Sequence, residues 1–182
     1  MGVFPEYYDS ARENEVVFSE PFPGGPVGLL HLKELPVEYA IDPVLDIEGA
    51  LQGLAKYRFG VVRGYLNTPE FDQARYLKKI QSSSDSNNLK MLLKKRVDIV
   101  FIDKLVAMEI INTSIPELRD KVEMVHPVLA HKSLYVAFSK QHPDHKRALA
   151  VFNRGLAELK RSRELGALLN EFGIPESHIH SE

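Results

Sequence analysis

The sequence has 182 residues, of which 44% are hydrophobic and 26% charged, and its formal net charge is -2. These proportions are typical of a globular protein and suggest neither a disordered nor a fibrous chain. The basic residues are scattered among acidic ones, so nucleic acid is not expected as a partner. Because cysteine is absent, disulfides, thiolate metal sites and cysteine nucleophiles are excluded. No apolar run approaches the roughly 18–20 residues that span a bilayer, and no secretory signal pattern follows Met1.

In the segment 16–55, the sequence predicts two short strands and one helix. Val16–Ser19 is a β-rich run, and a second run, Val27–Leu32, follows a cluster of proline and glycine. Residues 34–46 contain two prolines and little periodicity, which indicates an irregular connection. A short helix is expected at about 46–55.

Strands and helices then alternate. The apolar run Phe59–Val62 predicts a strand that stops at Arg63 and Gly64, and Thr68 followed by Pro69 predicts the start of a helix. Further elements are expected as a strand at 76–82, a helix at about 88–95 capped by Asp85 or Ser86, and a strand at 97–102. Asp103 is expected to cap the helix that comes next.

The second half continues this pattern. We expect a short helix at 115–122, strands at 123–128 and 133–139, an amphipathic helix at about 143–163 and a last helix at 164–172. Gly173 and Pro175 form a stop signal after it. The alternation predicts an α/β fold with a largely parallel sheet flanked by helices. Such sheets bind ligands at the carboxyl ends of their strands.

Two loops at strand ends are candidate ligand sites. The segment Arg63-Gly64-Tyr65-Leu66-Asn67-Thr68 leads into a helix N-terminus, where free N–H groups favour an anion such as a carboxylate. The alternative is an ordinary strand-to-helix turn. Asp103 offers a carboxylate that accepts hydrogen bonds from an ammonium group, and its alternative role is a helix cap. Both roles are compatible.

Arg12 is a third candidate, because a guanidinium group binds a carboxylate through two parallel hydrogen bonds. The alternative is a surface arginine without such a role. The seven histidines lack the spacing of three or four converging metal ligands, so neither a metal nor a cofactor is expected. No nucleophile elbow or pair of catalytic carboxylates stands out, and no enzymatic activity is predicted.

Three segments resemble bacterial extracellular solute-binding proteins of family 3, which serve polar amino-acid uptake. Ala11–Phe22 is similar to the family's arginine followed by φ-x-F-S-x-P-[YF]. Leu54–Gly64 is similar to L-x-G-x-x-φ-G-V-x-x-G, although Lys56 or Tyr57 replaces the first glycine. Leu92–Asp103 resembles L-x-x-G-x-φ-D-φ-φ-φ-x-D, with Lys95 in place of the glycine.

The resemblance implies a type 2 periplasmic-binding-protein fold and a receptor for an amino-acid-like ligand. The family's arginine binds the ligand carboxylate, the loop after the Gly-Val strand adds contacts, and the aspartate binds the α-amino group. By resemblance these roles fall on Arg12, on Arg63, Gly64, Tyr65, Asn67 and Thr68, and on Asp103. A membrane permease is the implied partner, and the periplasm is the implied location.

The resemblance also implies a division into two lobes. Residues 1–26 and 141–182 correspond to a remnant of lobe one, residues 34–132 to a complete lobe two, and residues 27–33 and 133–140 to hinge strands. The part of lobe one that precedes these segments in the family has no counterpart, so self-association through the incomplete lobe is expected.

Two other functions use the same fold. One is a sensory or regulatory domain, as in the input modules of membrane-bound kinases. The other is an enzyme related to prephenate or arogenate dehydratases, which needs a general acid. The candidates for the general acid in this sequence are Glu6 and Glu20.

Overall fold

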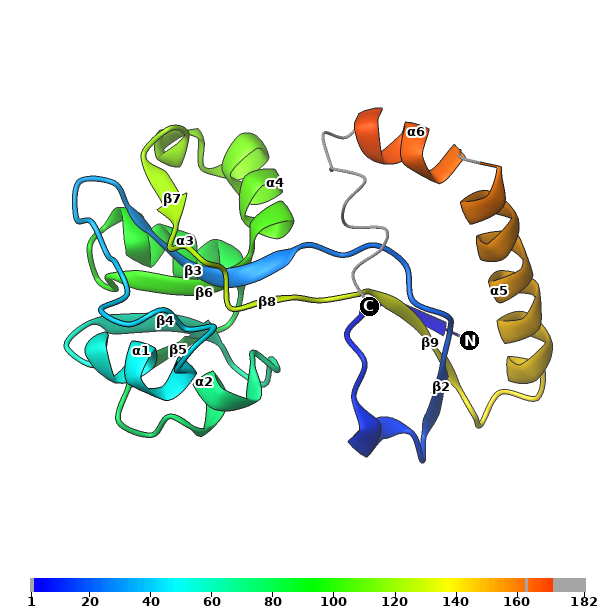
Figure 1. The fold of residues 1–182 in the computed structure, drawn as a ribbon. Coiled ribbons are helices and arrows are strands. Elements are labelled where there is room, and N and C mark those ends of the chain that lie inside the picture. Colours follow the sequence, from blue (N-terminus) through cyan, green and yellow to red (C-terminus); the bar gives the residue numbers. More distant parts are fainter. Residues whose placement is uncertain (1, 163, 172–182) are drawn as a thin grey trace. The chain divides into compact units, whose positions relative to one another are not determined.

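The computed structural model describes residues 2–162 and 164–171, which form two compact units (Figure 1). Unit 2 is Pro26–Ala130, and unit 1 contains the described residues up to Gly25 and from His131 onward. The chain therefore passes between the units twice, at Gly25–Pro26 and at Ala130–His131. Both crossings adjoin the segments 27–33 and 133–140 that we expected to be hinge strands.

Unit 2 is built on a mixed sheet with strand order β5-β4-β6-β3-β7, and β8 also pairs with β3. The strands are β3 (Pro26–Leu32), β4 (Arg58–Val62), β5 (Lys78–Ser82), β6 (Ile99–Asp103), β7 (Val122–Met124) and β8 (Ala130–His131). β4 pairs in parallel with both β5 and β6, whereas β3 is antiparallel to β6 and β7. The predicted α/β class is confirmed; the sheet is mixed, and the parallel strands that we expected are β5-β4-β6.

Helices flank this sheet (Figure 1). They are α1 (Ile47–Gly53), α2 (Pro69–Gln73), α3 (Asp85–Leu93) and α4 (Lys104–Ser114), followed by the 3-10 turn η2 (Pro116–Leu118). Thr68 and Asp103 cap α2 and α4, as predicted. Ser84, rather than Asp85 or Ser86, caps α3, because its side chain accepts from the Asn87 N–H. The helix expected at 115–122 is only η2, since Val122 already belongs to β7.

Lys95, at the end of α3, stands where the motif that this segment resembles has glycine. Its φ is 55°, in the left-handed region that a side chain disfavours and glycine adopts freely. The side chain is held by an ion pair of 2.9 Å to Glu34, on the connection that follows β3.

Side-chain contacts connect the parallel strands β4 and β6 of unit 2 in two places. Phe71 of α2 is fully buried, and its ring lies 5.5 Å from that of Phe59 on β4 and 4.8 Å from that of Phe101 on β6. At the amino ends, the Arg58 guanidinium donates to both carboxylate oxygens of Asp98, at 2.8 and 2.9 Å. This pairing lowers the pKa of Asp98. These contacts hold β4 and β6 side by side, so the loops that follow them share one edge.

Unit 1 contains a three-stranded antiparallel sheet of order β1-β9-β2. Its elements are β1 (Gly2–Glu6), the 3-10 turn η1 (Ser10–Arg12), β2 (Val16–Phe18), β9 (Tyr135–Ser139), α5 (His145–Arg161) and α6 (Glu164–Glu171). β9 lies at the centre, and the amphipathic helix α5 packs on β9 and β2. β1 was not predicted, because its partner β9 lies more than 120 residues later. The predicted helix end at Phe172 and the stop signal lie outside the described residues.

Among the residues that the structure describes, no helix combines the length and the apolar composition that a membrane span needs.

Candidate functional site

The loop after β4 turns sharply at Gly64, whose φ of 80° lies in the left-handed region. The Tyr65 N–H donates to the Val62 carbonyl, closing the turn, and the Arg63 N–H donates to the Ser82 carbonyl at the end of β5. Arg63 and Tyr65 are exposed. The loop thus begins as an extension of the parallel ladder and then presents its side chains to solvent.

At the end of this loop, most of the hydrogen bonds are made with other residues of the chain. The Asp72 carboxylate accepts from the Asn67 backbone N–H at 2.9 Å and from its side-chain amide at 2.8 Å. Thr68 is buried, and its hydroxyl accepts from the Phe71 N–H at 3.4 Å. A carboxylate of the chain itself therefore lies at the start of α2, where we expected that of a ligand.

Asp103 occupies the predicted position at the carboxyl end of β6. Its Oδ1 accepts from the N–H groups of Leu105 at 2.7 Å and Val106 at 3.2 Å, so the cap role is real. The residue is half-buried. Because β4 and β6 are adjacent and parallel, the loop 63–68 and Asp103 lie at the same edge of the unit 2 sheet. The structure brings these two candidates together.

Asp85 is an acidic residue at this edge that sequence reasoning treated only as a possible cap. It is the first residue of α3, which begins just after β5, and it is half-buried. Burial and the neighbouring Asp103 carboxylate raise the pKa of Asp85 to about 6. In the sequence, Asp85 is recognisable only as an acidic residue at the start of a helix that follows a predicted strand. Its proximity to Asp103 depends on the tertiary structure.

Arg12 belongs to unit 1, where it ends η1 just before β2. Its Nη1 donates to Glu6 Oε2 of β1 at 2.6 Å, and both side chains are partly exposed. The same contact engages Glu6, one of the two residues considered as a general acid. A guanidinium group has five N–H donors, so the pairing leaves capacity for a second carboxylate.

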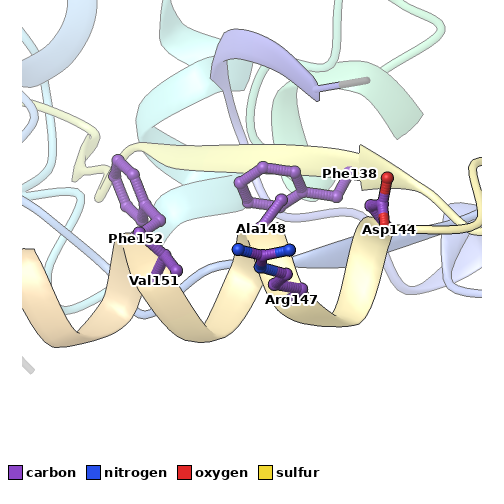
Figure 2. Close-up of a pocket in the computed structure, with 6 residues that line it drawn as sticks. All are labelled: Phe138, Asp144, Arg147, Ala148, Val151 and Phe152. Atoms are coloured by element: carbon purple, nitrogen blue, oxygen red, sulfur yellow. The ribbon is translucent and has the colours of Figure 1, made fainter.

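Two surface hollows lie in unit 1, and neither contains a predicted ligand residue. The first has a volume of about 510 Å³ and lies between β9 and α5, with mainly apolar side chains (Figure 2). It is lined by Phe138, Asp144, Arg147, Ala148, Val151 and Phe152. The second, of about 560 Å³, is lined by nine residues that include the aromatic side chains Tyr8, Phe18 and Tyr135. Their ring centroids are 5.1 to 6.0 Å apart.

In the part of the chain that the structure describes, no group of three or more His, Cys, Asp or Glu side chains is arranged to hold a metal ion. His178 and His180 lie outside that part.

No protein-family model and no curated protein matches the sequence. Solved structures do match. A substrate-binding protein of an amino acid ABC transporter is 17% identical with a TM-score of 0.71, over 92% of this chain and 67% of its own. A P235GK mutant of ArgBP from T. maritima is 19% identical with a TM-score of 0.68, over 91% and 65%. A solute receptor for L-cysteine of Neisseria gonorrhoeae is 16% identical with a TM-score of 0.66, over 91% and 60%.

The chain has the type 2 periplasmic-binding-protein fold. The resemblance seen in the three sequence motifs is thereby confirmed at the level of fold. The chain spans about two thirds of the length of these solved structures, or less.

Proposed function

We propose that this chain is a solute-binding component of an ABC importer for amino acids or similar small polar ligands. The observation that carries the proposal is the common edge of the unit 2 sheet, where the loop 63–68 and Asp103 follow two adjacent parallel strands. Two of the matching structures are described as a substrate-binding protein of an amino acid ABC transporter and a solute receptor for L-cysteine, which supports this proposal. A permease partner, a periplasmic location and a function without catalysis belong to the same proposal.

The proposal gives each polar group of an amino acid a partner. Arg12 binds the ligand carboxylate through guanidinium donors, sharing its charge with Glu6. Asp103 accepts from the ammonium group while its Oδ1 continues to cap α4. Arg63, Gly64, Tyr65, Asn67 and Thr68 supply main-chain and side-chain contacts around the ligand.

The two lobes of the proposal follow the boundaries predicted from sequence. Residues 34–132 form lobe two, residues 1–26 and 141–182 contribute to lobe one, and residues 27–33 and 133–140 act as hinge strands. In the importer, ligand binding shifts the lobes toward a closed form that the permease recognises.

Replacing Asp103 with asparagine tests the assigned ligand contact. Asparagine caps a helix about as well as aspartate, so the melting temperature should fall little, if at all. Loss of the charge opposite an ammonium group should weaken binding by about 2–5 kcal/mol. Calorimetric titration of the chain with the twenty amino acids measures this loss. Asp46→Asn, at the cap of α1, is the matched control and should bind normally. If no amino acid binds the unchanged chain, the proposed function is wrong.

Self-association through unit 1 is a further part of the proposal. Val3 and Phe4 of β1 are 55% and 60% exposed, and β1 pairs on one side with β9. Exposed apolar side chains on a sheet edge favour association. Sedimentation equilibrium should therefore show a concentration-dependent oligomer that Phe4→Ser weakens. Leu45→Ser, at an exposed position of unit 2, should leave association unchanged. A monomer at all concentrations would contradict this part.

A further inference from the structure

Two backbone hydrogen bonds attach the near end of the loop 63–68 to the sheet of unit 2. The Arg63 N–H donates to the Ser82 carbonyl of β5 at 3.0 Å, and the Tyr65 N–H donates to the Val62 carbonyl of β4 at 3.2 Å. The far end of the loop leads into α2, a helix of five residues. So short a helix is not stable by itself, and its position depends on contacts with the rest of the unit. The far end of the loop is therefore placed by the contacts that fix α2.

Lys79 of β5 holds the carboxyl end of α2. Its ammonium group donates to the carbonyl oxygens of Phe71 at 2.6 Å and of Asp72 at 2.9 Å. A lysine often satisfies the last carbonyl groups of a helix in this way. The same ammonium group lies 5.0 Å from the centroid of the buried Phe71 ring. Lys79 thus joins a strand of the sheet to the helix that ends the loop.

The surroundings of Lys79 differ from those of the lysine beside it. Lys79 is half-buried, and burial lowers its pKa, whereas the nearby Asp72 raises it. A partly desolvated ammonium group needs hydrogen-bond acceptors, which the two α2 carbonyls supply. Lys78 is exposed and donates instead to the Lys56 carbonyl, at 3.4 Å, in the segment before β4. Lys78 is therefore a natural control for the contacts of Lys79.

Asp72 connects Lys79 to the loop. Its carboxylate oxygens accept from the backbone N–H of Asn67 at 2.9 Å and from the Asn67 side-chain amide at 2.8 Å. Asn67 directly precedes Thr68, the cap residue of α2. The carbonyl group of Asp72 is held by Lys79, and its carboxylate holds Asn67. One residue of α2 therefore links β5 to the far end of the loop.

We propose that Lys79 is a positioning residue for the ligand site, which acts through Asp72 to hold the loop 63–68 in its binding conformation. The inference rests on the proposed function, in which this loop contacts the ligand. A loop that is ordered before the ligand arrives gives a higher affinity, because less conformational entropy is lost on binding. The charge of Lys79 serves this order by binding α2.

Lys79→Met removes the ammonium donors and keeps an unbranched apolar side chain. The Asn67 N–H, which the Asp72 carboxylate protects, should then exchange with solvent about tenfold faster. The Tyr65 N–H, at the near end of the loop, should exchange as before. Amide hydrogen exchange followed by NMR measures both rates. Asp72→Ala should have the same effect on Asn67, and Lys78→Met should change neither rate.

Ligand affinity is the readout that a purely structural role would not change. With an amino acid that binds the unchanged chain, Lys79→Met should weaken binding about tenfold in isothermal titration well below the melting temperature. Lys78→Met should bind normally. Asp72→Ala leaves Lys79 and Phe71 in place and provides the same comparison if Lys79→Met does not fold.

Two results would overturn the positioning role. One is an unchanged exchange rate at Asn67, and the other is a lower melting temperature of the variants with unchanged affinity. If no amino acid binds the unchanged chain, the proposed function is wrong. The exchange rates at Asn67 and Tyr65 need no ligand, so they still decide whether Lys79 holds the loop.

Discussion

Replacing Phe71 with alanine should lower the free energy of unfolding of unit 2 by about 3–5 kcal/mol. The side chain is fully buried, and its ring contacts those of Phe59 and Phe101 at 5.5 and 4.8 Å. Removing it leaves a cavity between α2 and two central strands. The Lys79 ammonium group, which lies 5.0 Å from the ring, also loses its aromatic neighbour.

Urea unfolding followed by circular dichroism measures this loss. Tyr65→Ala is the matched control, because Tyr65 is also aromatic and lies in the preceding loop but is 59% exposed. Its effect should stay within about 0.5 kcal/mol. Equal shifts of the two unfolding midpoints would contradict the view that the three phenylalanines form the core beneath the candidate site.

Gly24→Ala should destabilise unit 1 by about 2–3 kcal/mol. A Cβ at Gly24 would lie 1.9 Å from the Lys132 carbonyl oxygen and 3.2 Å from Leu134 Cγ. The first of these atoms belongs to the backbone, so the two chain segments must move apart. Their separation weakens the adjoining hydrogen bonds between Phe22 and Leu134 and from Lys132 N–H to the Gly25 carbonyl.

The same substitution at Gly155 is the control for Gly24. Gly155 lies in the middle of α5, and a Cβ there meets no atom within 4 Å. Alanine favours a helix interior over glycine by about 0.5–1 kcal/mol. Thermal unfolding should therefore give shifts of opposite sign for Gly24→Ala and Gly155→Ala. Shifts of the same sign would show that the close approach at Gly24 is absent.

Local patterns in the sequence were sufficient to predict elements that are stabilised by contacts between residues a few positions apart. Thr68 before Pro69 and Asp103 after an apolar run predict the caps of α2 and α4, because a cap depends on a side chain and N–H groups two or three positions later. The strand at Val16–Phe18 was predicted from a β-rich run, and the helix α5 from its amphipathic periodicity.

Elements and pairings that depend on distant residues could not be predicted in this way. β1 contains Pro5 and is an exposed strand, and it forms because β9 lies beside it. The ion pair between Arg12 and Glu6 likewise depends on the path of the chain between β1 and η1. Neither has a sequence pattern of its own.

By itself, the sequence determined the α/β class, the caps of α2 and α4 and the three motifs that resemble solute-binding proteins, because these depend on periodicity and short spacings. Only the tertiary structure decided that the Asp103 carboxylate lies close enough to Asp85 to raise its pKa. The strand order β5-β4-β6 brings together side chains that lie 18 residues apart, and the electrostatic environment of a carboxylate depends on such neighbours.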